Sequence, residues 1–253
     1  MSKTKIYEKI ELTIIALCII FVISIISYNK EIPMLTSANY EKTIGWGIKR
    51  ENNHLQPDVG SKNKQILEEN NGICMGRDGE KIIYLTFDSG YEAGYMDKIL
   101  TTLKENNVKA TFFVTDGNSD YRYLLAKEAA AGHTVAIHSA THDYKYIYSS
   151  CDAYFEDLNR MSDIITEQTG KRPKLLRFPG GSSNTISKQY CSRIMSVLTK
   201  AVSDQGYKYF DWNVSSGDAG GTTSTSEVYN NVISGIQSHD ISVVLQHDIK
   251  LFS

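Results

Sequence analysis

From residue 81 onward, short continuous apolar runs alternate with segments whose apolar residues recur every three or four positions. The apolar runs cover residues 81–87, 110–114, 134–138, 174–178, 207–214 and 241–247. Runs of this length without regular polar alternation are typical of strands that are buried on both faces. The pattern therefore predicts a parallel sheet with helices packed over it.

The periodic segments between these runs have the spacing of amphipathic helices. Helices are expected over about residues 96–103, 121–131, 155–165, 194–202 and 227–236. So many strand–helix units in one domain indicate an α/β fold of the distorted (β/α) barrel type. In such a fold, reactive side chains gather at the carboxyl ends of the strands.

Residues 1–28 follow a different pattern. Lys3, Lys5 and Lys9 precede an apolar run over residues 12–26, a little shorter than the roughly 20 residues that span a bilayer comfortably. A cleaved signal peptide and a retained anchor both fit this run, and a buried soluble helix is the plainer alternative. No small-x-small cleavage site follows it, which favours an anchor. The lysines in front should place everything after residue 28 outside the cytoplasm.

The chain is thus expected to have three parts. Residues 1–28 form a cytoplasmic tip followed by a membrane anchor or signal. Residues 29–80 are polar, rich in Asn and Lys and without apolar periodicity, and are interpreted as an extracytoplasmic stem. Residues 81–253 carry the strand–helix pattern and form the main domain. The protein is therefore placed at the cell membrane as a single-pass protein, with secretion as the alternative.

Composition argues against one class of partner and one kind of site. Of 253 residues, 41% are hydrophobic and 22% charged, and the net charge is −2. This is the balance of an ordinary folded protein, with no basic field to attract nucleic acid. The cysteines match no metal-binding spacing and allow at most one disulfide among Cys74, Cys151 and Cys191.

Polar side chains stand at the ends of four of the predicted strands. Asp88, His138, Arg177 and His247 each come at or just after the end of an apolar run. In a barrel, such positions converge on one mouth. A lone Asp at a strand end is more often a helix cap, which is the alternative for Asp88.

His138 and His142 lie four residues apart in the stretch HSATH. This separation lets two imidazoles face one metal ion if the segment makes a helical turn. A pair of solvated or core histidines is the alternative. The spacing alone leaves both interpretations open.

Five short motifs then occur in order: TFDSG at 86–90, HSATH at 138–142, RFPGG at 177–181, SSGDA at 215–219 and LQH at 245–247. In this order they resemble the motifs of the NodB-type polysaccharide deacetylases, carbohydrate esterase family 4. The preceding stretch, GWGIKRENNHLQPDVG at 45–60, is similar to the PdaA-type branch, the spore-cortex enzymes that de-N-acetylate muramic acid.

The resemblance implies a hydrolase that depends on a divalent metal. His138 and His142 would hold the ion, with Ser89 as an uncertain third ligand. Zinc is the expected metal, and manganese, cobalt and magnesium are alternatives. A bound divalent ion polarises a carbonyl and lowers the pKa of water.

The resemblance also assigns the acid–base groups. Asp88 would deprotonate the attacking water, and Arg177 would keep Asp88 ionised. His247 would protonate the departing amine, oriented by Asp218, with Asp211 as a competing orienter. The oxyanion and the substrate would be bound at Pro179 and Gly180, where the Gly180 amide stabilises the negative charge.

The sequence departs from the family pattern in three places. Ser89 stands where the family has a second aspartate, and a hydroxyl is a poorer metal ligand than a carboxylate. Ser215 and Ala219 replace an aspartate and a tryptophan, which removes one wall of the substrate groove. The chain ends at Ser253, where family members continue, so the main domain is expected to be truncated and its barrel incompletely closed.

These features together predict a peptidoglycan N-deacetylase that releases acetate, with N-acetylmuramic acid as the favoured sugar. N-acetylglucosamine or a chitooligosaccharide is the alternative substrate. A carbohydrate-binding relative with impaired catalysis is the alternative from another class. Retention of Asp88 and His247 argues against it, because binding alone needs neither a base nor an acid.

Overall fold

The computed structural model of this chain describes residues 81–220, 222 and 224–249. The predicted membrane segment and stem, at 1–28 and 29–80, lie outside the described residues, as do the last residues of the chain. Among the described residues, no helix combines the length and the apolar character needed to cross a membrane.

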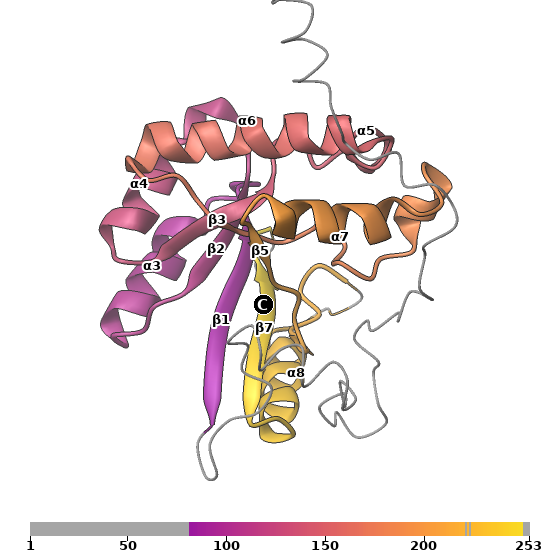
Figure 1. The fold of residues 1–253 in the computed structure, drawn as a ribbon. Coiled ribbons are helices and arrows are strands. Elements are labelled where there is room, and N and C mark those ends of the chain that lie inside the picture. The colour runs from indigo at the N-terminus through magenta and orange to yellow at the C-terminus, as the bar shows by residue number, and fades with distance from the viewer. Residues whose placement is uncertain (1–80, 221, 223, 250–253) are drawn as a thin grey trace, which may run out of the picture. The chain divides into compact units, whose positions relative to one another are not determined.

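Seven parallel strands form one sheet, in the order β5-β4-β3-β2-β1-β7-β6 (Figure 1). They are β1 (Ile82–Ser89), β2 (Thr111–Thr115), β3 (Thr134–Ser139), β4 (Leu175–Leu176), β5 (Lys208–Tyr209), β6 (Val214–Ser215) and β7 (Ile241–His247). Within the described residues, β5 and β6 are the edges and do not pair with each other. The predicted barrel is therefore a half-barrel, while the parallel α/β class is confirmed.

Helices join the strands and cover the sheet. They are α3 (Met96–Glu105), α4 (Tyr123–Ala130), α5 (Tyr144–Ile147), α6 (Cys151–Thr169), α7 (Ile194–Asp204) and α8 (Thr225–Gln237), with 3₁₀ turns η1 (Ser119–Tyr121) and η2 (Ile186–Gln189). Helix α6 packs on β3, α7 on β5, and α8 on β6 and β7. The five predicted helices are thus confirmed, and only the short α5, η1 and η2 were not expected.

The helices place most of their charged residues outward and their apolar residues on the sheet, and Glu128 of α4 and Asp157 of α6 are buried exceptions. In α6, Leu158, Met161 and Ile165 are buried, as their spacing predicted. The hydroxyl of Ser150 caps the first turn, and Gly170, with φ of 71°, ends the helix.

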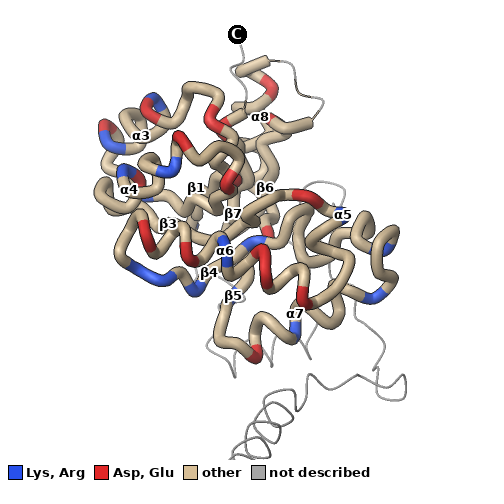
Figure 2. The backbone as a smooth tube through the Cα atoms, turned by 90° about the horizontal axis from the view of Figure 1, so that it is seen from above, with Lys and Arg blue, Asp and Glu red and all other residues tan. Residues whose placement is uncertain are grey.

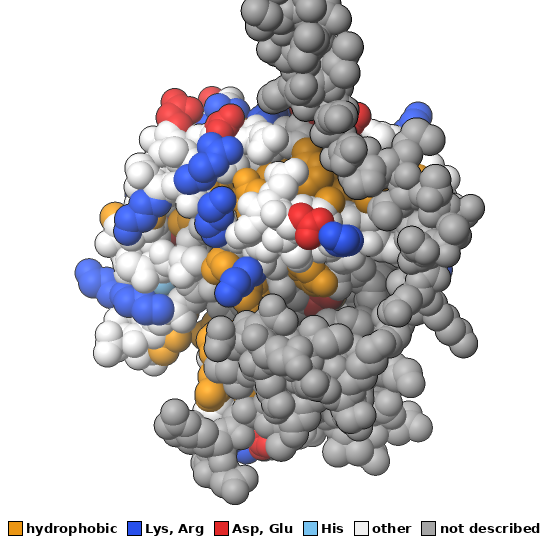
Figure 3. Space-filling model, in the orientation of Figure 1, with side chains coloured by type: hydrophobic (Ala, Val, Ile, Leu, Met, Phe, Trp, Pro, Cys, Tyr) orange, Lys and Arg blue, Asp and Glu red, His pale blue; other side chains and the backbone are white. Residues whose placement is uncertain are grey.

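Seen from above in Figure 2, Lys, Arg, Asp and Glu lie mainly on the helices and loops around the strands. On the face shown in Figure 3, Lys and Arg side chains are spread over the described surface, with hydrophobic side chains between them.

The run at 207–214 does not form the single strand that its apolar character predicted. It forms β5 and β6 at opposite edges of the sheet, and the chain crosses between them through Phe210 and Asp211. A side chain that follows another strand accounts for the break, because the guanidinium of Arg177 donates hydrogen bonds to the carbonyl oxygens of Phe210 and Asp211, at 3.0 and 3.2 Å. A continuous strand would have used these carbonyls in a ladder.

Candidate active site

Asp88 lies near the carboxyl end of β1 and is only 4% exposed. Its Oδ1 accepts a hydrogen bond from Nη1 of Arg177 at 2.7 Å. The N-cap of the following helix, α3, is Tyr95. The helix-cap interpretation of Asp88 is therefore wrong, and the carboxylate belongs to a buried ion pair.

Arg177 follows β4 directly and has no exposed surface. Besides Asp88, its Nη1 donates to Thr86 Oγ1 at 2.9 Å, and its guanidinium lies 4.2 Å from the ring centroid of Phe113. With the two carbonyls already described, these contacts use the donors of the guanidinium in a fixed geometry. Removing a charged guanidinium from water is costly, and pairing and hydrogen bonds of this kind offset that cost.

His138, in β3, is the second buried group at this edge of the sheet. Its Nδ1 lies 2.8 Å from the carbonyl oxygen of Arg177, and its Nε2 lies 3.6 Å from Asp88 Oδ2. Because a carbonyl can only accept, Nδ1 carries the proton in the neutral ring and Nε2 presents a lone pair. Burial lowers the pKa of His138 and outweighs the attraction of Asp88, so the neutral ring is favoured.

His142 comes close to His138 without the helical turn that was expected. The chain bends after β3, His142 adopts a left-handed conformation with φ of 52°, and the two ring centroids lie 5.1 Å apart. Burial and the neighbouring His138 lower the pKa of His142 to about 4. Both imidazoles are therefore neutral at neutral pH, which is the form that binds metals.

The bend is held by Asp157, a buried residue of α6. Its carboxylate accepts hydrogen bonds from Ser139 Oγ, the amides of Ala140 and Thr141, and Thr141 Oγ1, at 2.7 to 2.9 Å. Ser139 Oγ in turn accepts from the His142 amide at 2.9 Å. Sequence reasoning missed Asp157, although an aspartate within the apolar face of a helix was an available signal.

His247, the last residue of β7, lies beside Asp88 in the register of β1 and β7. Asp218 Oδ1 lies 2.8 Å from His247 Nδ1, and Asp218 Oδ2 accepts from the His247 amide at 2.6 Å. Burial alone lowers the pKa of His247, but the hydrogen bond and charge of Asp218 outweigh it, and the net shift is upward. For Asp218, burial raises the pKa, but the contacts with His247 prevail and lower it.

Asp211, the competing orienter, is engaged elsewhere. Its carboxylate accepts hydrogen bonds from the amide of Ser182 at 2.8 Å and from the Ser182 hydroxyl. It therefore supports the RFPGG loop, and the partner of His247 is Asp218.

Pro179 and Gly180 border the same edge of the sheet. The carbonyl of Pro179 accepts a hydrogen bond from the hydroxyl of Tyr148 at 2.7 Å. Gly180 has φ of 77°, and a Cβ there would lie 3.1 Å from the hydroxyl of Tyr144. Its amide makes no hydrogen bond with another described residue. The left-handed conformation favours glycine, and a side chain here would crowd Tyr144.

Ser89 ends β1 and has no exposed surface. Its Oγ finds no hydrogen-bond partner among the described residues. Gly90, with φ of 102°, turns the chain directly after Ser89. A buried hydroxyl without a partner is costly and is consistent with a missing ligand.

The donors around Asp88 fit a divalent ion that keeps open coordination positions. Two neutral imidazoles suit zinc, which commonly leaves a position to water in catalytic sites, and the buried hydroxyl of Ser89, next to Asp88 in the chain, is a further candidate donor. No group of three or more His, Cys, Asp or Glu that could hold a metal ion occurs in the part of the chain that the structure describes. The ion would therefore depend on His138, His142 and neutral oxygen donors.

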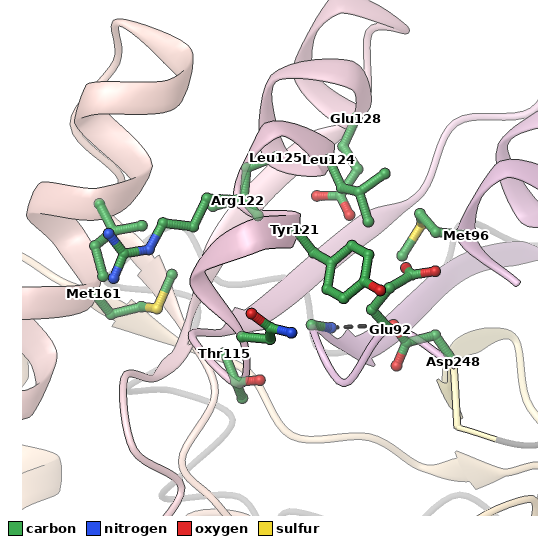
Figure 4. Close-up of a pocket in the computed structure, with 13 residues that line it drawn as sticks. Glu92, Met96, Thr115, Tyr121, Arg122, Leu124, Leu125, Glu128, Met161 and Asp248 are labelled. Carbon is green, nitrogen blue, oxygen red and sulfur yellow. Dashed lines mark hydrogen bonds between the residues drawn. The ribbon is translucent and has the colours of Figure 1, made fainter. Parts of the chain in front are cut away.

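A cluster of carboxyl groups borders a small pocket that Gly90 and Asp248 also line (Figure 4). It comprises Glu92, Glu128 and Asp248, each with one oxygen that lacks a hydrogen-bond partner among the described residues. Asp248 Oδ2 accepts from the Gly90 amide at 3.1 Å and so links the ends of β1 and β7. Burial raises the pKa of Glu128, which is 1% exposed, well above its ordinary value, and raises that of Asp248 as well.

At the carboxyl edge of its sheet, the half-barrel carries an aspartate–arginine pair, two adjacent imidazoles and a histidine–aspartate pair. This set of groups is typical of a polysaccharide deacetylase. The family model described as polysaccharide deacetylase matches residues 75–195. The chain belongs to this family, carbohydrate esterase family 4, and is an enzyme of the polysaccharide deacetylase class.

Individual relatives support this assignment. The crystal structure of the catalytic domain of peptidoglycan N-acetylglucosamine deacetylase from Eubacterium rectale is 54% identical, with a TM-score of 0.68, over 73% of this chain and 84% of that one. The structure of Bacillus subtilis PdaA, a family 4 carbohydrate esterase, is 28% identical, with a TM-score of 0.61, over 81% of this chain and 83% of that one.

A sequence comparison matches the full-length B. subtilis protein, named peptidoglycan-N-acetylmuramic acid deacetylase PdaA. It is 34% identical over 173 residues, which is 68% of this chain and 61% of that protein. The chain thus spans less than two thirds of that relative.

Proposed function

We propose that this enzyme removes N-acetyl groups from amino sugars of peptidoglycan and releases acetate. The observation that carries the proposal is the position of Asp88. Its Oδ1 is bound by Arg177 at 2.7 Å, while its Oδ2 faces the Nε2 of His138 at 3.6 Å. A buried carboxylate with one oxygen anchored and the other directed at a potential metal ligand is well placed to act as a base.

When bound at His138 and His142, a divalent ion would supply Lewis acidity toward the acetamide carbonyl. Zinc is the metal we propose, because imidazole nitrogens dominate the donor set, with manganese, cobalt and magnesium as alternatives. Ser89 is the proposed third ligand from the chain.

The residues of the chain carry the proton transfers. Asp88 takes a proton from the attacking water as the new C–O bond forms, and the Gly180 amide stabilises the negative charge on the carbonyl oxygen. His247, whose protonated form Asp218 stabilises, gives its proton to the sugar nitrogen as the C–N bond breaks. The products are acetate and a free amino sugar.

For the sugar, we propose N-acetylglucosamine, which differs from the preference reached from the sequence alone. The support is the 54% identity with the E. rectale domain named for that substrate. N-acetylmuramic acid is the second candidate, because of the similarity to PdaA.

We also propose that the catalytic domain lies outside the cytoplasm, held to the membrane by residues 12–26. The support is the apolar run and the lysines before it. Peptidoglycan is an extracytoplasmic polymer, so the location agrees with the substrate. Recovery of a soluble mature chain that begins near residue 28 would show a cleaved signal instead.

Acetate release tests the proposed activity. The protein is incubated with intact and with amidase-treated peptidoglycan, and the sugars are then analysed by mass spectrometry. Loss of one acetyl group from N-acetylglucosamine residues is expected, and loss from muramic acid would select the second candidate. Chelation of divalent ions should abolish acetate release, as should Asp88→Asn. Glycan binding without any acetate release would instead support the carbohydrate-binding alternative.

A further inference from the structure

Tyr144 stands at the edge of the site, two residues after His142, as the first residue of α5. Its ring meets the ring of His142 edge-on, with centroids 5.4 Å apart, and the ring of Tyr148 at 5.7 Å. Asp143 caps the helix by accepting a hydrogen bond from the Lys145 amide at 2.9 Å. The ring of Tyr144 is thus held in place on both sides.

The hydroxyl of Tyr144 differs from those of the neighbouring tyrosines. The hydroxyls of Tyr146 and Tyr148 donate to Glu156 Oε2 and to the carbonyl of Pro179, each at 2.7 Å. Tyr144 Oη makes no hydrogen bond with any residue that the structure describes. It is a polar group that is partly shielded from water and free to meet a ligand.

This hydroxyl lies beside Gly180, the residue whose amide is the proposed donor to the oxyanion. A Cβ on Gly180 would come within 3.1 Å of Tyr144 Oη, so a side chain at position 180 would crowd the hydroxyl. A tyrosine hydroxyl has one proton to donate, and no described residue accepts it here.

We propose that Tyr144 is a catalytic residue whose hydroxyl, beside the Gly180 amide, donates a hydrogen bond to the acetamide carbonyl oxygen in the transition state. This inference rests on the proposed deacetylase activity. A preorganised donor at a developing oxyanion contributes mainly to kcat, because the bond strengthens as charge accumulates. Because Gly180 has no side chain, it leaves room for the Tyr144 hydroxyl as a second donor.

Tyr144→Phe tests the role, because it removes one oxygen and leaves the ring against His142. Removal of one oxyanion donor typically lowers kcat by about 100- to 1,000-fold. We expect a fall in kcat of at least about tenfold with little change in KM, measured as acetate release from soluble glycan chains prepared from peptidoglycan. Tyr146→Phe is the matched control, because it loses a hydroxyl from the same helix that bonds to Glu156 away from the site.

Two further measurements separate this role from its alternatives. The zinc affinity of Tyr144→Phe, measured by calorimetry, should equal that of the unaltered protein. A weaker affinity would assign the effect to the packing of His142 and overturn the proposal. An unchanged kcat, or an effect on KM alone, would overturn it as well.

A tetrahedral probe keeps the inference testable if the unaltered protein releases no acetate, which would contradict the proposed function. A glucosamine oligosaccharide that carries a methylphosphonamidate in place of the acetamide mimics the transition state. We expect Tyr144→Phe to bind this probe at least about tenfold more weakly than Tyr146→Phe does. Equal affinities would refute the role of Tyr144.

Discussion

At the scale of single residues, the site places charged groups inside the protein and gives each of them a partner. Asp88 pairs with Arg177, and Asp218 pairs with His247. Removal of one member of a buried pair leaves the other charge uncompensated, which typically costs about 3–5 kcal/mol of stability. Variants that test chemistry here should therefore keep size and hydrogen bonding where possible.

Asp218→Asn should shift the pH dependence of deacetylation without removing the side chain. Asp218 raises the pKa of His247, and His247 must be protonated to act as the acid. Activity is then lost as the pH rises through the pKa of His247. With the neutral amide this pKa falls, so the alkaline limb of the kcat profile should move to lower pH. An alkaline limb that does not move would contradict the assignment of His247 as the acid.

Ser89→Asp should tighten metal binding, because it adds an anionic oxygen beside the two imidazoles. We expect a gain of about tenfold, roughly 1.4 kcal/mol, in zinc affinity measured by calorimetry. The rate at saturating zinc need not rise, since the new charge weakens the Lewis acidity of the ion. An unchanged dissociation constant would show that position 89 does not face the ion.

At the scale of elements, the site depends on a helix that contributes no group to the proposed chemistry. Helix α6 packs on β3, and its Asp157 binds the turn that carries His142. A turn with φ of 52° at a non-glycine residue costs of order 1–3 kcal/mol and persists only where its surroundings hold it. The four donors gathered on Asp157 provide that support.

Asp157→Asn should therefore weaken zinc binding by at least about tenfold, because an amide group cannot accept all four hydrogen bonds and the His142 turn relaxes. Calorimetry measures the affinity, and circular dichroism verifies that the variant is folded. Asp163→Asn is the matched control, since Asp163 lies on the same helix and pairs with Arg172 at the surface. Equal affinities of the two variants would show that the turn holds without Asp157.

At the scale of the whole molecule, the half-barrel carries unpaired buried acids next to its site. Glu128 has an oxygen without a hydrogen-bond partner among the described residues, and it neighbours Asp248 and Glu92, so its ionised form is doubly unfavourable. Buried acids without partners lower the stability of the folded protein near its site. Because their ionisation is unfavourable, the stability of the protein depends on pH.

Glu128→Gln should stabilise the protein increasingly as the pH rises. Burial raises the pKa of Glu128 in the folded state, so its contribution to stability is full below the unfolded pKa and is lost as the pH rises through the folded pKa. Each unit of pKa difference corresponds to about 1.4 kcal/mol. Urea unfolding at acidic, neutral and alkaline pH measures the difference.

The exposed Glu105→Gln in α3 is the control, because it makes the same chemical change at the surface. Should the advantage of Glu128→Gln be the same at every pH, Glu128 would not be the group that titrates.

The sequence by itself determined the succession of strands and helices along the chain. It also determined that one edge of the sheet, at the carboxyl ends of the strands, would bring together Asp88, His138, Arg177 and His247. These follow from local patterns, because an apolar run has to be buried and the ends of parallel strands meet at one edge of their sheet. The family could be predicted for the same reason, since its motifs lie at those ends.

Only the tertiary structure decided the features that depend on contacts between distant segments. The run at 207–214 forms two strands because Arg177 donates hydrogen bonds to two carbonyl oxygens within it. His142 lies close to His138 because Asp157 of α6 holds the bend between them. The hydroxyl of Tyr144 came to lie beside Gly180 although 36 positions separate them along the chain (180 − 144). Such contacts leave no periodic trace in the sequence, because each depends on where two elements pack and not on the propensity of either one.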